Sequence, residues 1–196
     1  MKFQSDIDID FANRQDVLSL IKHVPASQLK DQNLVPHNTG IYVTAIPFDP
    51  VAKIAGLDYE TAESRGYIKL DFLNVNLYQQ VASEQHLEQL MNAEPDWTRF
   101  NNDQLFFEQL IHVNNHWAVL KKMPEPVDSI PRLAMLLSVI RPAKRHLIGQ
   151  LWKDVAASVW TKPSDDSYYF KKSHAIAYAH LVVVNMNLIS LADQNN

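Results

Sequence analysis

Near its N-terminus the chain reads Ser5-Asp6-Ile7-Asp8-Ile9-Asp10-Phe11, in which three carboxylates alternate with apolar side chains. Because side chains alternate across a β-strand, this pattern predicts a strand with Asp6, Asp8 and Asp10 on one face. The apolar residues between them would anchor the other face in a core. Two interpretations are open: the acidic face is simply solvated, or it binds hard cations such as Mg²⁺ or Mn²⁺, which relieve the repulsion between like charges.

The composition is that of an ordinary globular protein. The 196 residues, 46% of them hydrophobic, are enough for one substantial core or two small lobes that share one. The chain has no cysteine, which excludes disulfides and thiolate metal sites. No apolar run approaches the roughly 18 residues of a membrane span, and the acidic start does not resemble a signal peptide. We therefore expect a cytoplasmic protein that makes no contact with a membrane.

The charge changes sign along the chain. Residues 1–120 contain 8 Lys and Arg against 16 Asp and Glu, whereas residues 121–196 contain 10 against 6. An acidic part suited to metals is thus followed by a basic part suited to phosphates. Pro124, Pro126 and Pro131 interrupt the chain where the sign changes. This predicts two lobes, residues 1–123 and 124–196, packed as one compact unit.

The distribution of apolar residues predicts an α+β fold. Residues 40–45 and 67–73 are rich in β-branched, aromatic and aliphatic side chains, which is typical of strands. Helical spacing indicates helices over residues 13–24, 79–91, 103–113, 133–140, 151–160 and 173–191. A small mixed sheet with helices would therefore be followed by a mainly helical subdomain.

The predicted strand over residues 67–73 repeats the pattern of the first strand. Lys69 and Asp71 would share one face, and the other face would be apolar. If the two strands are neighbours, Asp71 joins Asp6 and Asp8 around a shared pair of cations, as two-metal phosphoryl transfer requires. The alternative is that Lys69 simply balances the charge of Asp71 on an exposed face.

Six segments of the chain, in this order, resemble the bacterial C-family replicative DNA polymerases, typified by the DNA polymerase III alpha subunit. They are Asp6-Ile-Asp-Ile-Asp-Phe11, His37-Asn-Thr-Gly-Ile-Tyr-Val43, Gly66-Tyr-Ile-Lys-Leu-Asp-Phe-Leu73, Ser129-Ile-Pro131, Ile140-Arg-Pro142 and Phe170-Lys-Lys-Ser-His-Ala-Ile-Ala-Tyr178. The resemblance spans residues 6–178 and implies a nucleotidyltransferase-like palm followed by helical fingers. In two positions the chain departs from the family, which usually has proline where this chain has Ser5 and glycine where it has Asn74.

The resemblance also implies roles for individual residues. Asp6, Asp8 and Asp71 would be catalytic and bind two Mg²⁺ or Mn²⁺ ions, with Asp10 in support. Four basic residues would contact phosphates of DNA or of the nucleotide: Lys69, Arg141, Lys172 and His174. The implied function is metal-dependent nucleotidyl transfer on DNA by a miniature polymerase core, with DNA and dNTP as partners. We expect other replication proteins to supply the Gly-Ser triphosphate motif that the family carries upstream. A phage could encode such a core, which would then act in the host cytoplasm.

Several alternatives remain beside this interpretation. The chain could be a non-catalytic replication module that binds DNA or polymerase subunits, or a nuclease that uses the same two-metal site. Arg141 could be a surface cation at a helix end, and His174 could lie in a solvated helix start with Ser173 as its N-cap. His37 suits a turn or packing role as well as a ligand role. His112 and His116 have the i, i+4 spacing of a zinc pair, which we interpret as a surface feature because the metalloprotease Glu is absent.

Overall fold

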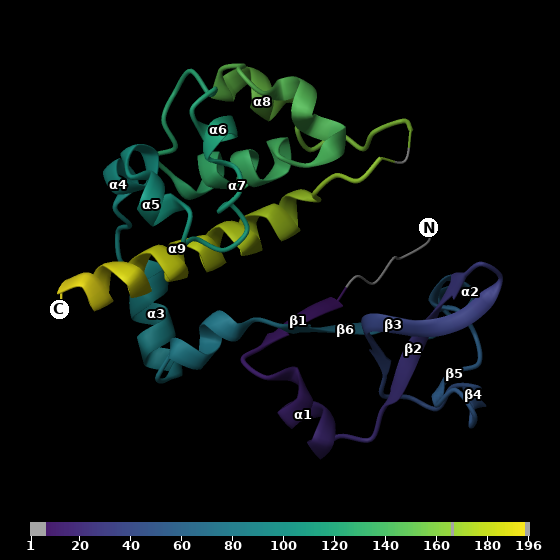
Figure 1. Ribbon diagram of the computed structural model, residues 1–196. Coiled ribbons are helices and arrows are strands. Elements are labelled where there is room, and N and C mark those ends of the chain that lie inside the picture. Colours follow the sequence, from purple (N-terminus) through teal and green to yellow (C-terminus); the bar gives the residue numbers. More distant parts are fainter. Residues whose placement is uncertain (1–6, 166, 195–196) are drawn as a thin grey trace. The chain divides into compact units, whose positions relative to one another are not determined.

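The computed structural model describes residues 7–165 and 167–194 (Figure 1). Contacts divide the chain into two compact units, Met1–Val81 and Ala82–Asn196. We call them the sheet unit and the helical unit. The α+β fold predicted from the sequence is confirmed, because the first unit contains a mixed β-sheet and the second is helical.

A four-stranded sheet organises the sheet unit. Its strands follow the order β1 (Ile7–Phe11), β6 (Leu70–Asn74), β3 (Asn33–Tyr42) and β2 (Val24–Lys30). β1 runs parallel to β6, whereas β3 is antiparallel to both β6 and β2. The opening strand and the strand of Asp71 are therefore neighbours.

The apolar face of this sheet is covered by α1 (Arg14–Leu20), which Asn13 caps by accepting a hydrogen bond from the backbone N–H of Gln15. Leu18 of this helix packs with Ile41 and Phe72 in a small core. The rings of Phe11 and Phe72 lie 4.7 Å apart, centroid to centroid. This packing fixes which face of β1 and β6 is apolar and leaves the aspartates on the other.

The sheet unit has four short elements: β4 (Phe48–Asp49), β5 (Ile54–Ala55), α2 (Tyr59–Ser64) and the 3₁₀ helix η1 (Asn76–Gln80). Ala55 of β5 and Ala62 of α2 are buried with Ala26 and Tyr42 in a second small core.

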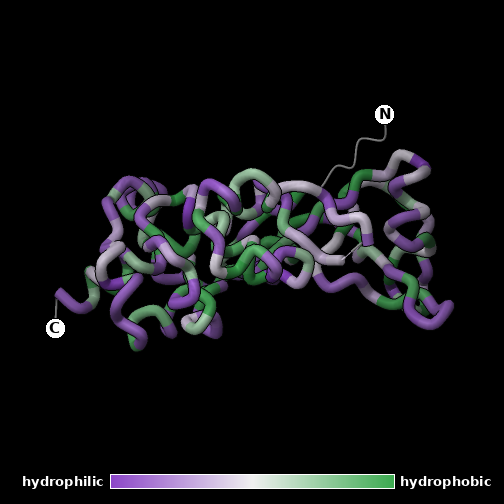
Figure 2. The backbone as a smooth tube through the Cα atoms, turned by 90° about the horizontal axis from the view of Figure 1, so that it is seen from above, coloured by the Kyte–Doolittle hydropathy of each residue, from purple (hydrophilic) through white to green (hydrophobic). Residues whose placement is uncertain are grey.

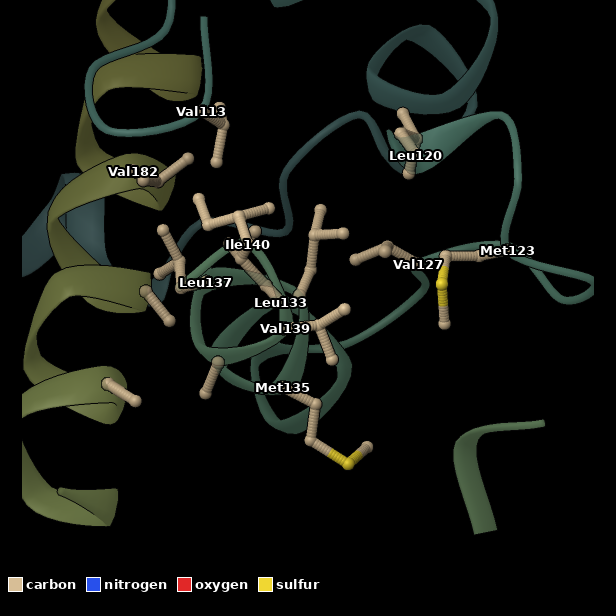
Figure 3. Packing of buried hydrophobic residues seen from close by; sticks show 14 of the residues in the cluster. Val113, Leu120, Met123, Val127, Leu133, Met135, Leu137, Val139, Ile140 and Val182 are labelled. Atoms are coloured by element: carbon tan, nitrogen blue, oxygen red, sulfur yellow. The ribbon is translucent and has the colours of Figure 1, made fainter. Parts of the chain in front are cut away.

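The helical unit contains α3 (Glu84–Asn92), α4 (Trp97–Asn102), α5 (Gln104–Phe107), α6 (Trp117–Leu120), α7 (Ile130–Val139), the 3₁₀ helix η2 (Pro142–Leu147), α8 (Trp152–Ser158) and α9 (Lys172–Gln194). Its core lies around α7, in which every residue from Leu133 to Val139 is buried. Leu137 and Ile140 lie beside Val182 of α9, and Leu133 lies beside Val127 (Figure 3). At the other end of the core Asn187 of α9 donates hydrogen bonds to the carbonyl oxygens of Leu90 and Ala93, at 2.8 and 3.0 Å, and so joins α9 to α3.

The boundary between the units differs from the one expected at residue 123. Phe100, Phe106 and Phe107 lie before that position and are fully buried in the same core as α7 and α9. Met123 and Val127, on either side of the expected boundary, belong to that core as well. The proline-rich segment is therefore a loop over one core, and the structural division lies at Val81 and Ala82 instead.

α9 is the longest helix of the described chain and is apolar for most of its length, ending in hydrophilic residues (Figure 2). By length and composition it could cross a membrane, contrary to our expectation that no segment could. Half of its most apolar stretch, however, is buried inside the helical unit. Ala175, Ala179, Val182 and Met186 pack in the common core. A core helix meets the same criterion, so α9 alone does not indicate a membrane span.

Candidate functional site

Two of the proposed metal ligands are adjacent in the sheet. Asp8 of β1 and Asp71 of β6 are direct Cα partners in the parallel register. Adjacent strands lie about 4.8 Å apart, and partners in register point to the same face. The fold therefore places Asp8 and Asp71 on neighbouring strands and on one face of the sheet, whereas Asp6 lies outside the described residues.

Asp71 is held by Thr39 of β3 and by Lys69, which lies directly before β6. It is only 8% exposed. Its Oδ1 accepts a hydrogen bond from the Thr39 hydroxyl at 2.7 Å, and its Oδ2 accepts one from the ammonium group of Lys69. The Lys69 Nζ also lies 5.7 Å from the centre of the Tyr59 ring. The position of the Asp71 carboxylate is thus fixed by a neutral donor on one side and a cation on the other.

His37 supports this arrangement as a neutral imidazole. Its Nδ1 accepts hydrogen bonds from the backbone N–H of Gly40 at 2.9 Å and of Thr39 at 3.3 Å. Because the Nδ1 lone pair is used, the ring proton belongs on Nε2, and the 3.6 Å approach of Nδ1 to Asp71 Oδ1 is not an ion pair. Burial and the charge of Lys69 both lower the pKa of His37. Its role here is to shape the loop that carries Thr39.

Gly40 is required by its close surroundings. A Cβ atom at this position would lie 2.8 Å from Cδ of Lys69 and 2.9 Å from Nδ1 of His37. A Cβ here would have to push the Lys69 stem or the His37 ring aside, so glycine leaves the space in which Lys69 reaches Asp71. Sequence reasoning missed the roles of Thr39 and Gly40, although both lie inside the quoted segment His37–Val43, and the glycine within a strand was the available signal.

Asp10 continues the acidic face along β1. Burial and the nearby charge of Asp8 raise the pKa of its carboxyl group. The pKa of the Tyr78 hydroxyl is raised in turn by burial and by the charge of Asp10. The mutual repulsion expected from the alternating carboxylates is therefore present in the folded chain.

The donor set on this face is of the type that Mg²⁺ and Mn²⁺ prefer, since Asp8 and Asp71 supply carboxylate oxygens from rigid strands. Within residues 7–165 and 167–194 no group of three or more His, Asp or Glu side chains is arranged to hold a metal ion. The third proposed ligand, Asp6, lies outside that range. A cation at Asp71 would also have to displace the ammonium group of Lys69 from Oδ2.

The other proposed phosphate contacts belong to the helical unit. Arg141 is the N-cap residue of η2, and its guanidinium lies 3.9 Å from the centre of the Phe170 ring. Lys172 and His174 lie in the first turn of α9. Lys172 lies at an otherwise apolar cavity of about 390 Å³ between α7, α8 and α9.

The histidines His112 and His116 are not a surface pair on one helix. They lie in the loop before α6, where His112 has a left-handed backbone with φ of 64°. The imidazole of His112 contacts the Tyr178 ring edge-on at 4.4 Å, and burial with the charge of Arg141 lowers its pKa to about 4. Both histidines are partly buried, which corrects the interpretation drawn from their spacing.

No protein-family model matches the chain, and no curated protein matches it significantly. The roles of its residues therefore rest on the motifs and the geometry described above.

Proposed function

We propose that the chain performs metal-dependent nucleotidyl transfer on DNA, as a miniature core similar to the C-family polymerases. Asp8 and Asp71, together with Asp6, would hold two Mg²⁺ or Mn²⁺ ions. The observation that supports this proposal most is the register of the parallel pair β1 and β6, which places Asp8 directly opposite Asp71.

Different residues of the sheet unit would have different roles at this site. The two ions, when bound, would activate the attacking hydroxyl and neutralise charge on the triphosphate. Thr39 orients Oδ1 of Asp71 through its hydroxyl. Lys69 neutralises Asp71 in the absence of a cation, and its long side chain is then free to contact a phosphate once a cation has taken its place.

The helical unit would contribute cations to the phosphates of DNA and nucleotide. Arg141, Lys172 and His174 are the residues that the resemblance assigns to this role. In support, Arg141 presents a guanidinium that donates no hydrogen bond to any residue in the described part of the chain.

Primer extension tests the proposal. Labelled dNTPs with Mg²⁺ or Mn²⁺ are supplied to the wild type, to Asp8→Asn and to Asp71→Asn, with and without candidate partner proteins. We expect extension by the wild type and none by either variant, because each loses a ligand charge. Asp16→Asn is the matched control, since Asp16 is an exposed carboxylate on α1, and it should extend primers normally. Shortening of the primer would identify a nuclease, and a wild type that does neither would refute the catalytic proposal.

One observation favours a second candidate, a non-catalytic replication module that binds DNA or polymerase subunits. The ion pair with Lys69 neutralises Asp71 without any metal, so the carboxylate is stable in an idle site. In that case the wild type binds primed DNA in a gel-shift assay but neither extends nor shortens it, and Asp71→Asn binds equally well.

A further inference from the structure

Arg141 occupies an unusual place in the helical unit. Its guanidinium lies 3.9 Å from the centre of the Phe170 ring, and that ring stacks on Tyr178 with centroids 5.3 Å apart and planes 19° apart. His112 also contacts Tyr178, with ring centroids 4.4 Å apart and planes at 85°. A cation over an aromatic face is attracted by the ring quadrupole, so the stack favours one orientation of the guanidinium.

No acceptor is provided for this guanidinium. Among the described residues Arg141 makes no side-chain hydrogen bond and no ion pair, and its Nε is buried without a partner. An arginine stays charged in proteins, and a buried donor without an acceptor is costly. By contrast Arg132, in the same unit, pairs with Asp128 at 2.9 Å and with Glu125 at 3.5 Å. Among the described residues Arg141 therefore lacks a counterion of the kind that Arg132 has on α7.

The groups around Arg141 are basic or aromatic. Its charge, together with burial, lowers the pKa of His112 and of His116, and the charge of Arg145 acts on His116 as well. The ionisable groups that act on Arg141 itself are Tyr168 and Tyr178. No carboxylate of the described chain contributes. Two guanidinium groups and two imidazoles therefore lie near one another, and no carboxylate of the described residues forms an ion pair with either arginine.

We infer that Arg141, Arg145, His112 and His116 form a phosphate-binding site in the helical unit. Guanidinium groups hold phosphate oxygens with paired N–H donors, and a phosphate dianion has enough oxygens to accept from two arginines and an imidazole together. Arg145 has donors to spare, because its one described hydrogen bond is a long one of 3.4 Å from Nε to the carbonyl oxygen of Ile140. The aromatic stack orients Arg141 before the anion arrives. Only contacts inside the helical unit enter this inference, so it stands whether or not Asp8 and Asp71 bind metals.

Isothermal titration of the full chain with inorganic tripolyphosphate tests the site. The titrations contain EDTA and are made at constant ionic strength, so that metals and general screening play no part. Arg141→Gln should weaken binding by about tenfold or more, because it removes charged hydrogen bonds. The matched control is Arg132→Gln, which makes the same change in net charge where the arginine already has carboxylate partners, and it should bind as the wild type does.

Two further measurements keep the inference testable if Arg141→Gln folds poorly. Arg145→Gln changes an exposed side chain and should also weaken binding. In the wild type, tripolyphosphate should raise the pKa of His112 and His116, followed by NMR of the ring protons, because a nearby anion stabilises the imidazolium form. Absence of binding, equal losses in Arg141→Gln and Arg132→Gln, or histidine resonances that do not respond would each overturn the inference.

The same titration separates this site from the proposed function. Asp71→Asn should bind tripolyphosphate as tightly as the wild type while losing primer extension. If the phosphate site fails but extension depends on Asp71, the proposed function survives alone. If tripolyphosphate binds as expected but the chain does not extend primers, the helical unit binds phosphates for another purpose.

Discussion

Replacing Lys69 by methionine tests how the charge of Asp71 is held. The substitution keeps most of the apolar stem and removes the ammonium group, leaving the Thr39 hydroxyl as the remaining described side-chain donor to Asp71. Breaking a fully buried ion pair costs about 3–5 kcal/mol because a charge is left without its partner. The side chains of Lys69 and Asp71 are 18% and 11% exposed, so water screens part of this effect. We expect Lys69→Met to lower the free energy of unfolding by about 1–3 kcal/mol.

Urea denaturation followed by circular dichroism measures this loss. The double variant Lys69→Met with Asp71→Asn should recover most of the stability, because an amide needs no counter-charge. Added Mg²⁺ supplies a second test, since a cation that binds only the folded chain at ten times its Kd stabilises it by about 1.4 kcal/mol. The ammonium group competes for Oδ2 in the wild type, so Mg²⁺ should stabilise Lys69→Met more than the wild type.

Two results would refute this reasoning. If Lys69→Met unfolds at the same urea concentration as the wild type, the ion pair does not stabilise Asp71. If Mg²⁺ leaves Lys69→Met unchanged, Asp71 is not a metal ligand, and the proposed function loses its main support.

Three further predictions concern other parts of the chain. Asn187→Ala leaves two carbonyl groups at the end of α3 without their donor, which should lower the free energy of unfolding by about 2 kcal/mol in thermal denaturation; an unchanged melting temperature would contradict this role. Gly40→Ala pushes against Lys69 and His37 and should cost about 1–3 kcal/mol in the same assay, whereas Gly56→Ala, where an added Cβ would come no closer than 3.5 Å to its neighbours, should cost little. His112 has a pKa of about 4 in the folded chain against the ordinary 6.5 of a solvated histidine, so the unfolded chain takes up the proton first as the pH falls. The free energy of unfolding should therefore decline between pH 6.5 and about 4. The variant His112→Asn should show a smaller decline, and asparagine is chosen because it tolerates the left-handed backbone at this position. Equal declines in the wild type and the variant would rule out this histidine as the cause.

The strands that carry the aspartates could be predicted from the sequence because alternation of side chains is a local property. The pattern from Ile7 to Phe11 assigns one face to the core, and the apolar partners Phe11 and Phe72 meet there. The ion pair of Lys69 with Asp71 matches the alternative in which Lys69 balances Asp71, except that Asp71 is buried instead of lying on an exposed face and that Lys69 lies directly before β6.

The strand β2 could not be predicted in the same way. Helical spacing suggested one helix over residues 13–24, but α1 ends at Leu20 and Val24 pairs with Tyr42 of β3. Pro25 suggested a break rather than a strand. It is tolerated because β2 lies at the edge of the sheet, where a residue without an N–H removes no interior hydrogen bond.

Contacts between residues that are far apart in the chain could not be predicted from the sequence either. Proline spacing marked a loop correctly, but whether Met123 and Val127 on either side share one core depends on tertiary packing. The spacing of His112 and His116 suggested a surface feature, whereas both side chains are partly buried in a loop in which His112 has a left-handed backbone. The isolation of Arg141 from carboxylates depends on which side chains the fold brings near it.

The parallel pairing of β1 with β6 has a consequence for the newly made protein. Ile7 pairs with Leu70, so the first strand is synthesised long before its partner. At about 5–20 residues per second, translation takes several seconds to proceed from β1 to β6. During that time the apolar residues of β1 are exposed to other chains. Alternating carboxylates are the kind of residue that discourages such a strand from joining an aggregate. The aspartates of β1 therefore protect the nascent chain before they take up any role in the folded one.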